Sequence, residues 1–386
     1  MKRIIYVIGS LDVGGTERHL VQLLPKLKAR GWDVSVYCIG RRGAMAIDLE
    51  KQNIAVKGPP WEAKKGMATW FRFARLITAA LGLLFVLLRQ RPHIAHFFLP
   101  GAYMVGGPCA LLLGIEICIM SRRSLNEYQP KRWILAWFEK QLHGYMHAVL
   151  GNSVAVVQQL AAEGVPENRI TLIYNGVDLA RFMQTRPRSE VRRELGVPPG
   201  CIVLIMVANL IPYKGHVDLI EALIQIREKI PSWRMLIVGR DDGMGEILRE
   251  QAETAELDAN IRWLGSRNDI AGLLNASDIG IHCSHEEGFS NAIIEAMAAG
   301  LPMVVTDVGG NAEAVTDGRT GLVVPPRSPN RLAEALLSIT SDASCSSMGT
   351  RGRERVEKLF SLESCVVKYD SLYHSLLGDC HKISRI

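Results

Sequence analysis

Glu287 and Glu295 stand eight positions apart in residues 283–297, where two carboxylates flank the expected change from a strand to a helix. Carboxylate oxygens accept hydrogen bonds from hydroxyl groups, so the pair suits a sugar better than a phosphate. Taken alone, the two residues could equally be solvated acids on an ordinary helix.

The residues around this pair predict the local structure that would position it. Residues 278–283 predict a buried strand, and residues 292–299 are rich in alanine and predict a helix. Ser290 or Asn291 is the expected N-cap of that helix. A strand, a glycine-containing loop and a helix N-terminus direct backbone N–H groups towards one point, which favours binding of a phosphate.

A lysine-glycine turn, Lys214–Gly215, follows the apolar run of residues 202–208 and precedes a helical pattern. Open α/β sheets bind ligands at such strand ends. Lys214 could therefore offset the negative charge that develops on a departing diphosphate. The alternative is a surface lysine in a turn.

Gly14 and Gly15 follow the first apolar run, residues 4–8. Glycines at the start of a helix let backbone N–H groups approach a ligand closely, although a plain tight turn is the alternative. The spacing is not G-x-G-x-x-G, which disfavours a dinucleotide site.

Three other polar residues end predicted strands. His96 lies in the strand of residues 94–99 and is either close to a substrate or a hydrogen-bonded core histidine. Arg122 and Arg123 follow the strand of residues 116–121, where they could meet an anionic acceptor or be solvated.

Together these segments resemble the retaining glycosyltransferases of family 4, which have the GT-B fold. Glu287 and Glu295 match the family's E-x7-E segment. The resemblance implies that Glu287 lies by the donor sugar as a catalytic residue and that Glu295 holds the ribose of the nucleotide. It also assigns to substrate binding the residues Gly288, Phe289, Ser290 and Asn291.

Lys214 matches the lysine of the family's R-x(4–5)-K-G segment, which implies a catalytic role in gripping the donor diphosphate. Asn209 or Ile211 stands where the family has an arginine. Asn209 is therefore placed among the substrate-binding residues, and Arg240 is a cation that could take the place of the missing arginine.

The first half matches the family at two further points. Gly14 and Gly15 resemble its G-G-x-E loop, which faces the donor phosphates, and His96 matches the first histidine of an H-x-H pair in which Phe98 replaces the second. The resemblance implies a catalytic role for His96. In the second half, Arg267 lies in the loop that contacts the nucleobase in the family.

Apolar runs alternate with helical patterns along most of the chain, which predicts an α/β fold of parallel, doubly wound sheets. The predicted strands are residues 4–8, 34–39, 94–99, 116–121, 148–151, 170–174, 202–208, 235–238, 261–264, 279–283, 303–306 and 321–324. The predicted helices include residues 17–30, 154–163, 217–229 and 330–340.

The pattern restarts near residue 201, after a charged, proline-containing stretch at residues 186–200 that predicts a linker. We therefore expect a Rossmann-like acceptor-side domain at residues 1–185 and a nucleotide-sugar-binding Rossmann-like domain at residues 186–361, facing across a cleft. By resemblance, a helix in residues 362–386 packs back on the first domain.

The composition, with 48% hydrophobic and 22% charged residues over 386 positions, is that of a well-packed globular protein. A net charge of +6 without a nucleic-acid motif gives no reason to expect nucleic acid as a partner. The eight cysteines include no C-x-x-C pair, which favours reduced thiols in a cytoplasmic protein. No metal-binding motif is present, and we expect neither a metal nor another cofactor.

Residues 64–89 combine Lys64, Lys65, Trp70 and Phe71 with an uncharged run at residues 76–88. That run is too short to span a bilayer comfortably, so it predicts either a buried core helix or an interfacial helix on anionic lipid. A second basic and aromatic stretch at residues 131–138 favours peripheral attachment, on the inner face of the membrane.

The function expected from these features is transfer of a sugar, with retention, from a UDP- or GDP-sugar to a glycan or lipid-linked acceptor in cell-surface polysaccharide synthesis. A nucleotide-sugar epimerase and a catalytically weak donor-binding scaffold are the alternatives. A nicotinamide-dependent oxidoreductase would need the glycine fingerprint that the chain lacks.

Overall fold

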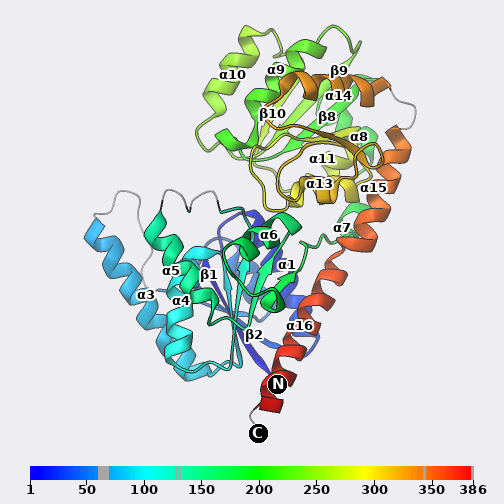
Figure 1. Ribbon diagram of the computed structural model, residues 1–386. Coiled ribbons are helices and arrows are strands. Elements are labelled where there is room, and N and C mark those ends of the chain that lie inside the picture. The colour runs from blue at the N-terminus through cyan, green and yellow to red at the C-terminus, as the bar shows by residue number, and fades with distance from the viewer. Residues whose placement is uncertain (60–68, 127–128, 130–131, 342–344, 384–386) are drawn as a thin grey trace. The chain divides into compact units, whose positions relative to one another are not determined.

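The computed structural model describes residues 1–59, 69–126, 129, 132–341 and 345–383. The chain divides into two compact units (Figure 1). Unit 1 comprises residues 1–176 together with 362–386, and unit 2 comprises residues 177–361. Each unit is an α/β structure built on a parallel sheet, as the alternation of apolar strands and helices predicted.

Unit 1 contains a seven-stranded sheet in the order β3-β2-β1-β4-β5-β6-β7. Its elements are β1 (Arg3–Ser10), α1 (Gly15–Ala29), β2 (Asp33–Arg41), α2 (Ala46–Lys51), β3 (Ala55–Lys57), α3 (Thr69–Gln90), β4 (Ile94–Phe98), α4 (Pro100–Leu112), β5 (Ile117–Arg122), α5 (Trp133–His143), β6 (Ala148–Gly151), α6 (Val154–Ala162), η1 (Glu167–Arg169), β7 (Ile170–Leu172) and α16 (Leu362–Ile383).

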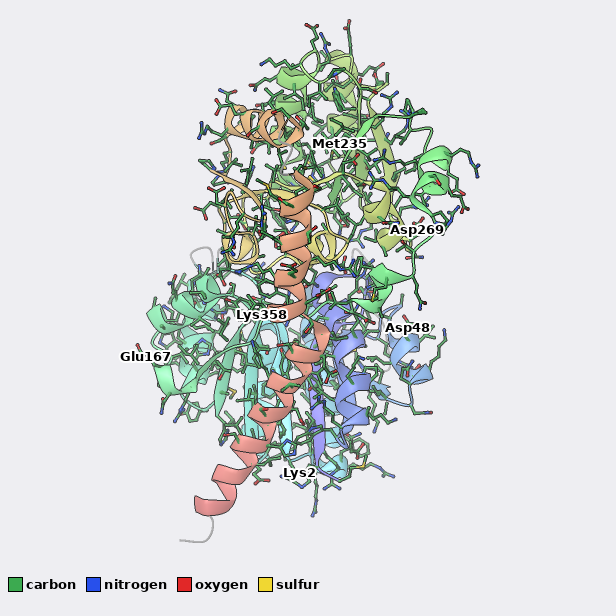
Figure 2. All side chains as sticks on the ribbon, turned by 90° about the vertical axis from the view of Figure 1, so that its right-hand side faces the viewer. Lys2, Asp48, Glu167, Met235, Asp269 and Lys358 are labelled. Atoms are coloured by element: carbon green, nitrogen blue, oxygen red, sulfur yellow. The ribbon has the colours of Figure 1, made fainter. Side chains whose placement is uncertain are left out.

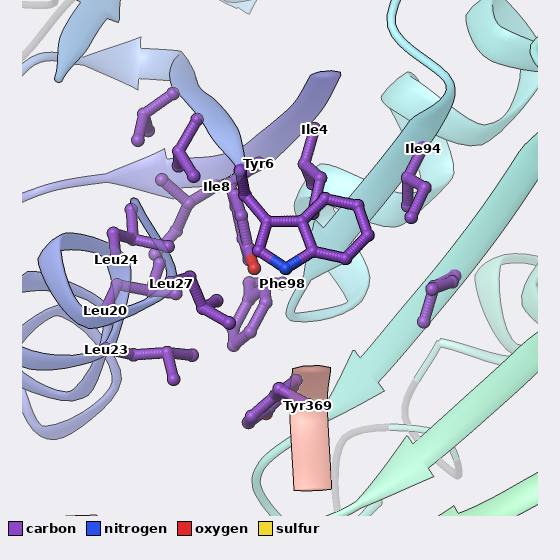
Figure 3. Close-up of a cluster of buried hydrophobic side chains, with 14 of the residues drawn as sticks. Ile4, Tyr6, Ile8, Leu20, Leu23, Leu24, Leu27, Ile94, Phe98 and Tyr369 are labelled. Carbon is purple, nitrogen blue, oxygen red and sulfur yellow. The ribbon is translucent and has the colours of Figure 1, made fainter. Parts of the chain in front are cut away.

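Alternate residues of β1 enter two different cores, because successive side chains of a strand point to opposite faces of its sheet. Tyr6 and Ile8 pack with Leu23 of α1 and Tyr369 of α16 (Figure 3). Val7 packs on the other face, in the core formed with α3, α4, α5 and α6. Helices therefore cover both faces of the sheet.

Unit 2 contains a six-stranded sheet in the order β10-β9-β8-β11-β12-β13. Its elements are α7 (Ala180–Met183), α8 (Arg188–Glu194), β8 (Ile202–Val207), η2 (Pro212–Lys214), α9 (His216–Ile226), β9 (Trp233–Val238), α10 (Gly245–Thr254), β10 (Ile261–Gly265), α11 (Ile270–Ala276), β11 (Ile279–His282), α12 (Asn291–Ala298), β12 (Met303–Thr306), α13 (Asn311–Ala314), β13 (Gly321–Val324), α14 (Pro329–Ser341) and α15 (Cys345–Leu359).

The main core of unit 2 lies between this sheet and the helices α9, α10 and α14, and Met235 of β9 is fully buried in it (Figure 2). On β8, Leu204 and Met206 enter this core, whereas Val203 and Ile205 are buried at the alternate positions. Burial at both sets of positions is typical of a parallel sheet covered on both faces.

Two features differ from the sequence predictions. The stretch at residues 186–200, predicted as a linker, contains α8, whose Arg188 and Arg192 both pair with Asp278 just before β11. The charges that suggested a linker therefore belong to ion pairs within unit 2. The division between the two units falls earlier, after Gly176. The short strand β3 was not predicted.

Six of the described cysteines are buried thiols outside any disulfide: Cys38, Cys109, Cys118, Cys201, Cys283 and Cys365. Among the described residues, no helix combines the length and the apolar character that a membrane crossing requires.

Candidate functional site

The sheet of unit 2 has a switch point between β8 and β11. From β8 the chain proceeds through β9 to β10 at one edge, and it then returns to add β11, β12 and β13 on the other side. Ligands of open α/β sheets bind at the carboxyl ends of the strands on either side of such a point. Lys214 follows β8 and Glu287 follows β11, so the topology brings together two residues distant in sequence.

Gly215 determines the path of the chain after Lys214. Its φ is +74°, and a Cβ atom at this position would overlap the carbonyl group of Cys283. The turn therefore lies directly against the strand end that leads to Glu287, with the Cys283 thiol 3.1 Å from the Gly215 carbonyl oxygen. Only glycine allows this approach, and it leaves Lys214 Nζ bonded to Oε1 of Glu287.

Glu287 is a largely buried carboxylate whose side chain is 14% exposed. His282 Nε2 lies 2.8 Å from its Oε1, and the Ser284 hydroxyl donates to the same oxygen at 3.4 Å. Burial would raise the pKa of Glu287, but the nearby Lys214 ammonium and the hydrogen bond from His282 lower that pKa to about 2. The carboxylate is therefore ionised at neutral pH.

The loop after β12 supports the backbone on both sides of Glu287. The Gly310 N–H donates to the Gly288 carbonyl oxygen at 2.9 Å, and a Cβ atom on Gly309, whose φ is +51°, would overlap the Glu287 carbonyl group. The Thr306 hydroxyl donates to the Ser284 carbonyl oxygen at 2.6 Å. These contacts fix the loop and thereby the direction of the Glu287 side chain.

Glu295 is buried on α12, where its carboxylate lies 3.9 Å from the guanidinium of Arg181. Ser290 is the N-cap of α12 but makes no side-chain capping hydrogen bond. The ring of Phe289 is buried and packs on Phe360 at 5.2 Å between centroids. Because the ring of Phe289 is buried in the core, any substrate binding by this residue would use its backbone.

Asn209 and Arg240 are neighbours, although 31 residues separate them. The Asn209 side-chain carbonyl oxygen accepts from the Arg240 backbone N–H at 3.2 Å. The Arg240 guanidinium forms two hydrogen bonds with Asp242, at 2.7 and 2.9 Å, and its side chain is 54% exposed. Arg240, which the sequence suggested as a replacement for the family's arginine, thus lies beside Asn209, the position where the family has that arginine.

Arg267 follows the edge strand β10. Its guanidinium pairs with both carboxylate oxygens of Asp269, at 2.8 and 2.6 Å (Figure 2 marks Asp269). The structure thus brings Lys214 and Glu287 into contact but gives Arg267 a different, local partner.

Unit 1 has its own switch point, between β1 and β4. Gly14 is the N-cap of α1, and a Cβ atom there would overlap the carboxylate of Glu17. Burial raises the pKa of Glu17. The glycine turn therefore places the start of α1 beside the half-buried carboxyl group of Glu17.

His96 is fully buried beside this switch point, and hydrogen bonds occupy both nitrogens of its ring. Nδ1 lies 2.8 Å from the Tyr373 hydroxyl, which in turn lies 2.7 Å from the Tyr6 hydroxyl, and Nε2 lies 2.8 Å from the Ser121 hydroxyl. Burial, with a contribution from the nearby Arg123, lowers the pKa of His96 well below its usual value. These bonds describe a core histidine, and a catalytic role for His96 stays a prediction.

Arg122 and Arg123 are both buried, so neither is the solvated arginine that the sequence allowed. Arg122 pairs with Glu139 at 2.6 Å and with Glu163 at 2.5 Å, which ties β5 to α5 and α6. Arg123 donates to the Asn175 side-chain oxygen at 2.5 Å.

His282 and Ser284 were not predicted as site residues, although both contact Glu287. The available signal was their place at the carboxyl end of a buried strand, five and three positions before Glu287. Asp218 and His285, which pair at 2.8 Å across the Lys214 turn, gave no comparable signal.

Comparison with known proteins gives two family matches. Residues 13–181 match the model described as Glycosyltransferase Family 4, and residues 187–355 match the model described as Glycosyl transferases group 1. Each match falls almost entirely within one of the two units.

Two relatives and one solved structure illustrate the similarity. The chain is 30% identical to a D-inositol 3-phosphate glycosyltransferase of Corynebacterium glutamicum, over 96% of this chain and 94% of that protein. It is 30% identical to the UDP-Gal:alpha-D-GlcNAc-diphosphoundecaprenol alpha-1,3-galactosyltransferase of Escherichia coli, over 53% of this chain and 54% of that protein. Several such matches to curated relatives span only about half of the relative's length. The fold is similar to that of Anabaena Alr3699/HepE in complex with UDP, with a TM-score of 0.84, 23% identity and coverage of 97% and 100% of the two chains.

Proposed function

Because the chain belongs to the group 1 glycosyltransferases of family 4, we propose that it transfers a sugar from a nucleotide diphosphate sugar to an acceptor hydroxyl with retention of anomeric configuration. The observation that carries this proposal is the contact between Lys214 and the largely buried Glu287 at the switch point of unit 2. Lys214 would provide a cation for the diphosphate, and Glu287 would provide an anion for the sugar hydroxyls, so the two would form adjacent subsites.

The proposed reaction needs no protein nucleophile. The bond between C1 of the donor sugar and the β-phosphate oxygen breaks, and its electron pair stays on that oxygen. The acceptor hydroxyl oxygen attacks C1 from the same face, and its proton passes to the leaving phosphate oxygen. Lys214 and the N–H groups at the start of α12 stabilise the charge on the diphosphate. Glu287 orients hydroxyls of the donor sugar, and Glu295 binds the ribose.

The roles of the remaining predicted residues follow from the family resemblance. Gly14 and Gly15 would bind donor phosphates through backbone N–H groups, and the loop with Arg267 would contact the nucleobase. Arg240 would supply the second cation beside Asn209, where the family has an arginine. Its position supports this role, because the backbone N–H of Arg240 is hydrogen-bonded to Asn209 and its side chain is 54% exposed.

We further propose a lipid-linked or membrane-proximal glycan as acceptor, in cell-surface polysaccharide synthesis on the cytoplasmic face of a membrane. Apolar side chains on unit 1 support this. Leu81 and Phe85 of α3 and Trp133 and Trp137 of α5 are each at least 59% exposed. Lys64, Lys65 and Lys131 lie outside the described residues, as do the side chains of Trp70 and Phe71. The E. coli relative, whose name specifies a diphosphoundecaprenol-linked sugar, is consistent with such an acceptor.

The experiment begins with a panel of UDP- and GDP-sugars, because a tight ligand raises the melting temperature by mass action. With the donor that stabilises the protein most, release of the nucleotide is measured for Glu287→Gln and Lys214→Ala. We expect each substitution to lower kcat by about 100- to 1000-fold, because each removes charge that stabilises the transition state.

Glu286→Gln is the matched control, since it removes the neighbouring carboxylate of the same loop and should keep turnover within about threefold. Near-normal turnover in both Glu287→Gln and Lys214→Ala would overturn the proposal. Donor binding without transfer or hydrolysis would favour the scaffold alternative, to which the replaced arginine at Asn209 and the replaced histidine at Phe98 point. Turnover of the donor sugar without an acceptor would favour the epimerase.

A further inference from the structure

His282 is the last residue of β11 and is 2% exposed. Its Nε2 atom lies 2.8 Å from Oε1 of Glu287 and 3.0 Å from the hydroxyl oxygen of Ser284. An ionised carboxylate can only accept hydrogen bonds, so the proton of this pair sits on Nε2 of the imidazole. His282 is therefore a donor to Glu287.

The other ring nitrogen, Nδ1, is buried and has no hydrogen-bond partner within the described part of the chain. A bare lone pair at such a position costs less than a buried, unpaired N–H of a cationic ring. Burial accordingly lowers the pKa of His282, although the hydrogen bond to Glu287 opposes the shift. His282 is thus a neutral imidazole with its proton on Nε2.

Three groups converge on one oxygen of Glu287. Lys214 Nζ, His282 Nε2 and the Ser284 hydroxyl all contact Oε1, and Oε2 receives none of these three bonds. The carboxylate is therefore anchored through one oxygen, which leaves the other directed away from the anchor. A carboxylate held in this way can present Oε2 to a hydroxyl group of a bound sugar.

Under the proposed function, Lys214 has a second partner, the diphosphate of the donor. An ammonium that moves towards the diphosphate weakens its bond to Glu287, and a buried carboxylate that loses its cation is left with a large desolvation penalty. Of the three groups on Oε1, His282 and Ser284 then remain, and His282 makes the shorter bond.

We propose that His282 is a positioning residue for Glu287: its Nε2–H holds Oε1 of the carboxylate while Lys214 binds the donor diphosphate, so that Oε2 stays directed at the donor sugar. This inference rests on the proposed function, because it needs a diphosphate to compete for Lys214. It assigns to His282 an effect on the chemical step rather than on nucleotide binding.

The test compares four variants of the full-length chain. His282→Leu removes the donor at similar volume, His282→Asn keeps an amide that is too short to reach Oε1, and His282→Gln places an amide N–H near the position of Nε2. His285→Gln is the matched control, because His285 belongs to the same loop but bonds Asp218 instead of Glu287. Each variant is measured for UDP affinity, KM for the donor sugar, kcat and the pH dependence of kcat.

We expect His282→Leu and His282→Asn to lower kcat by about 10- to 100-fold, with UDP affinity and KM changed by less than about threefold. Loss of the Nε2–H removes a bond that lowers the pKa of Glu287. The carboxylate must be ionised to act, so the acid limb of the kcat profile should move to higher pH. His282→Gln should restore most of kcat and the original limb, and His285→Gln should show an unshifted profile.

Full kcat with an unshifted acid limb in His282→Leu would overturn the inference. If that variant does not fold, equal losses of kcat in His282→Gln and His282→Asn would overturn the inference instead. A purely structural role would not depend on whether the amide reaches Oε1. The proposed function fails separately: it falls if Glu287→Gln and Lys214→Ala retain turnover, whereas the inference alone falls if they lose turnover and His282→Leu does not.

Discussion

At the scale of single residues, Gly215 connects the fold of unit 2 to its chemistry. The chain can place Lys214 on Glu287 only if the next residue adopts a positive φ and carries no side chain against the Cys283 carbonyl. Gly318 offers a comparison, since its φ is +66° but a Cβ atom there would meet nothing within 4 Å. The two positions share the same backbone requirement and differ in the space around them.

We therefore expect Gly318→Ala to cost about 1 kcal/mol of unfolding free energy, from backbone conformation alone. Gly215→Ala should cost more, about 2 to 4 kcal/mol, because the turn must also move away from β11. It should also lower sugar-transfer kcat by at least about tenfold, because that movement displaces Lys214. Urea unfolding and initial rates test both variants. Equal stability losses, or full activity of Gly215→Ala, would contradict this account.

The sequence offered Lys214 and Glu287 as candidate site residues because their spacing within local segments is informative, and the structure places the two in contact. It could not identify the partners of His96, since Tyr373 lies 277 residues further along the chain. It assigned Phe289 with its neighbours to the substrate, whereas the ring packs on Phe360, 71 positions away by number. Contacts between distant segments depend on the tertiary fold, and local spacing carries no information about them.

At the scale of elements, most strands were predictable because buried parallel strands are continuous apolar runs. The strand β3 (Ala55–Lys57) was missed since only Val56 of its three residues is buried, which leaves no run to detect. The helix α3 shows the limit of the same reasoning. An apolar run at residues 76–88 predicted a core helix or an interfacial one. The structure shows one buried face and one exposed apolar face, and contact with a membrane stays a prediction.

One face of α3 is buried, with Ala79, Leu83 and Leu87 in the core of unit 1. The opposite face exposes Ile77, Leu81, Phe85 and Leu88, which are 48% to 64% accessible and follow helical spacing. On α5, Trp133, Ile134 and Trp137 are similarly exposed. Both helices pack against α4, and Figure 1 shows all three on the same side of unit 1.

The charges around these exposed faces are complementary to anionic lipid. The sequence of α3 contains no acidic residue, and the one acid of α5, Glu139, is buried against Arg122. Arg89 and Lys140 are exposed on the two helices. Tryptophans and basic side chains on an apolar helix face are typical of contact with a membrane interface.

We accordingly predict that the protein binds vesicles containing phosphatidylglycerol and binds neutral phosphatidylcholine vesicles more weakly. The combined substitution Phe85→Glu and Trp137→Glu should weaken binding by at least about tenfold, because it removes apolar area and adds repulsive charge. Ile47→Glu, which alters an exposed apolar residue of α2, is the control and should bind as before. Co-flotation measures the bound fraction, and equal binding by the double variant and the control would refute the membrane surface.

At the scale of the whole molecule, the chain leaves unit 1 after Gly176, forms unit 2 and returns as α16. Val177 and Ser361 pair in a parallel bridge where the two crossings occur. Tyr369, Tyr373 and Leu377 of α16 are buried in the core of unit 1, beside Leu20 and Tyr6 (Figure 3 shows Tyr369). Unit 1 is thus built from two segments that are far apart in the sequence, whereas unit 2 is continuous.

This asymmetry predicts different behaviour of the two units as fragments. Residues 177–361 contain their own sheet and core, so this fragment should unfold in one cooperative thermal transition. Residues 1–176 alone should lack such a transition, because loss of α16 exposes one face of the core and removes the Tyr373 hydroxyl from Tyr6 and His96. Joining residues 362–386 to residues 1–176 through a flexible linker should restore it. Circular dichroism melting curves decide the matter: a sharp transition in residues 1–176 alone would show that α16 is dispensable for unit 1.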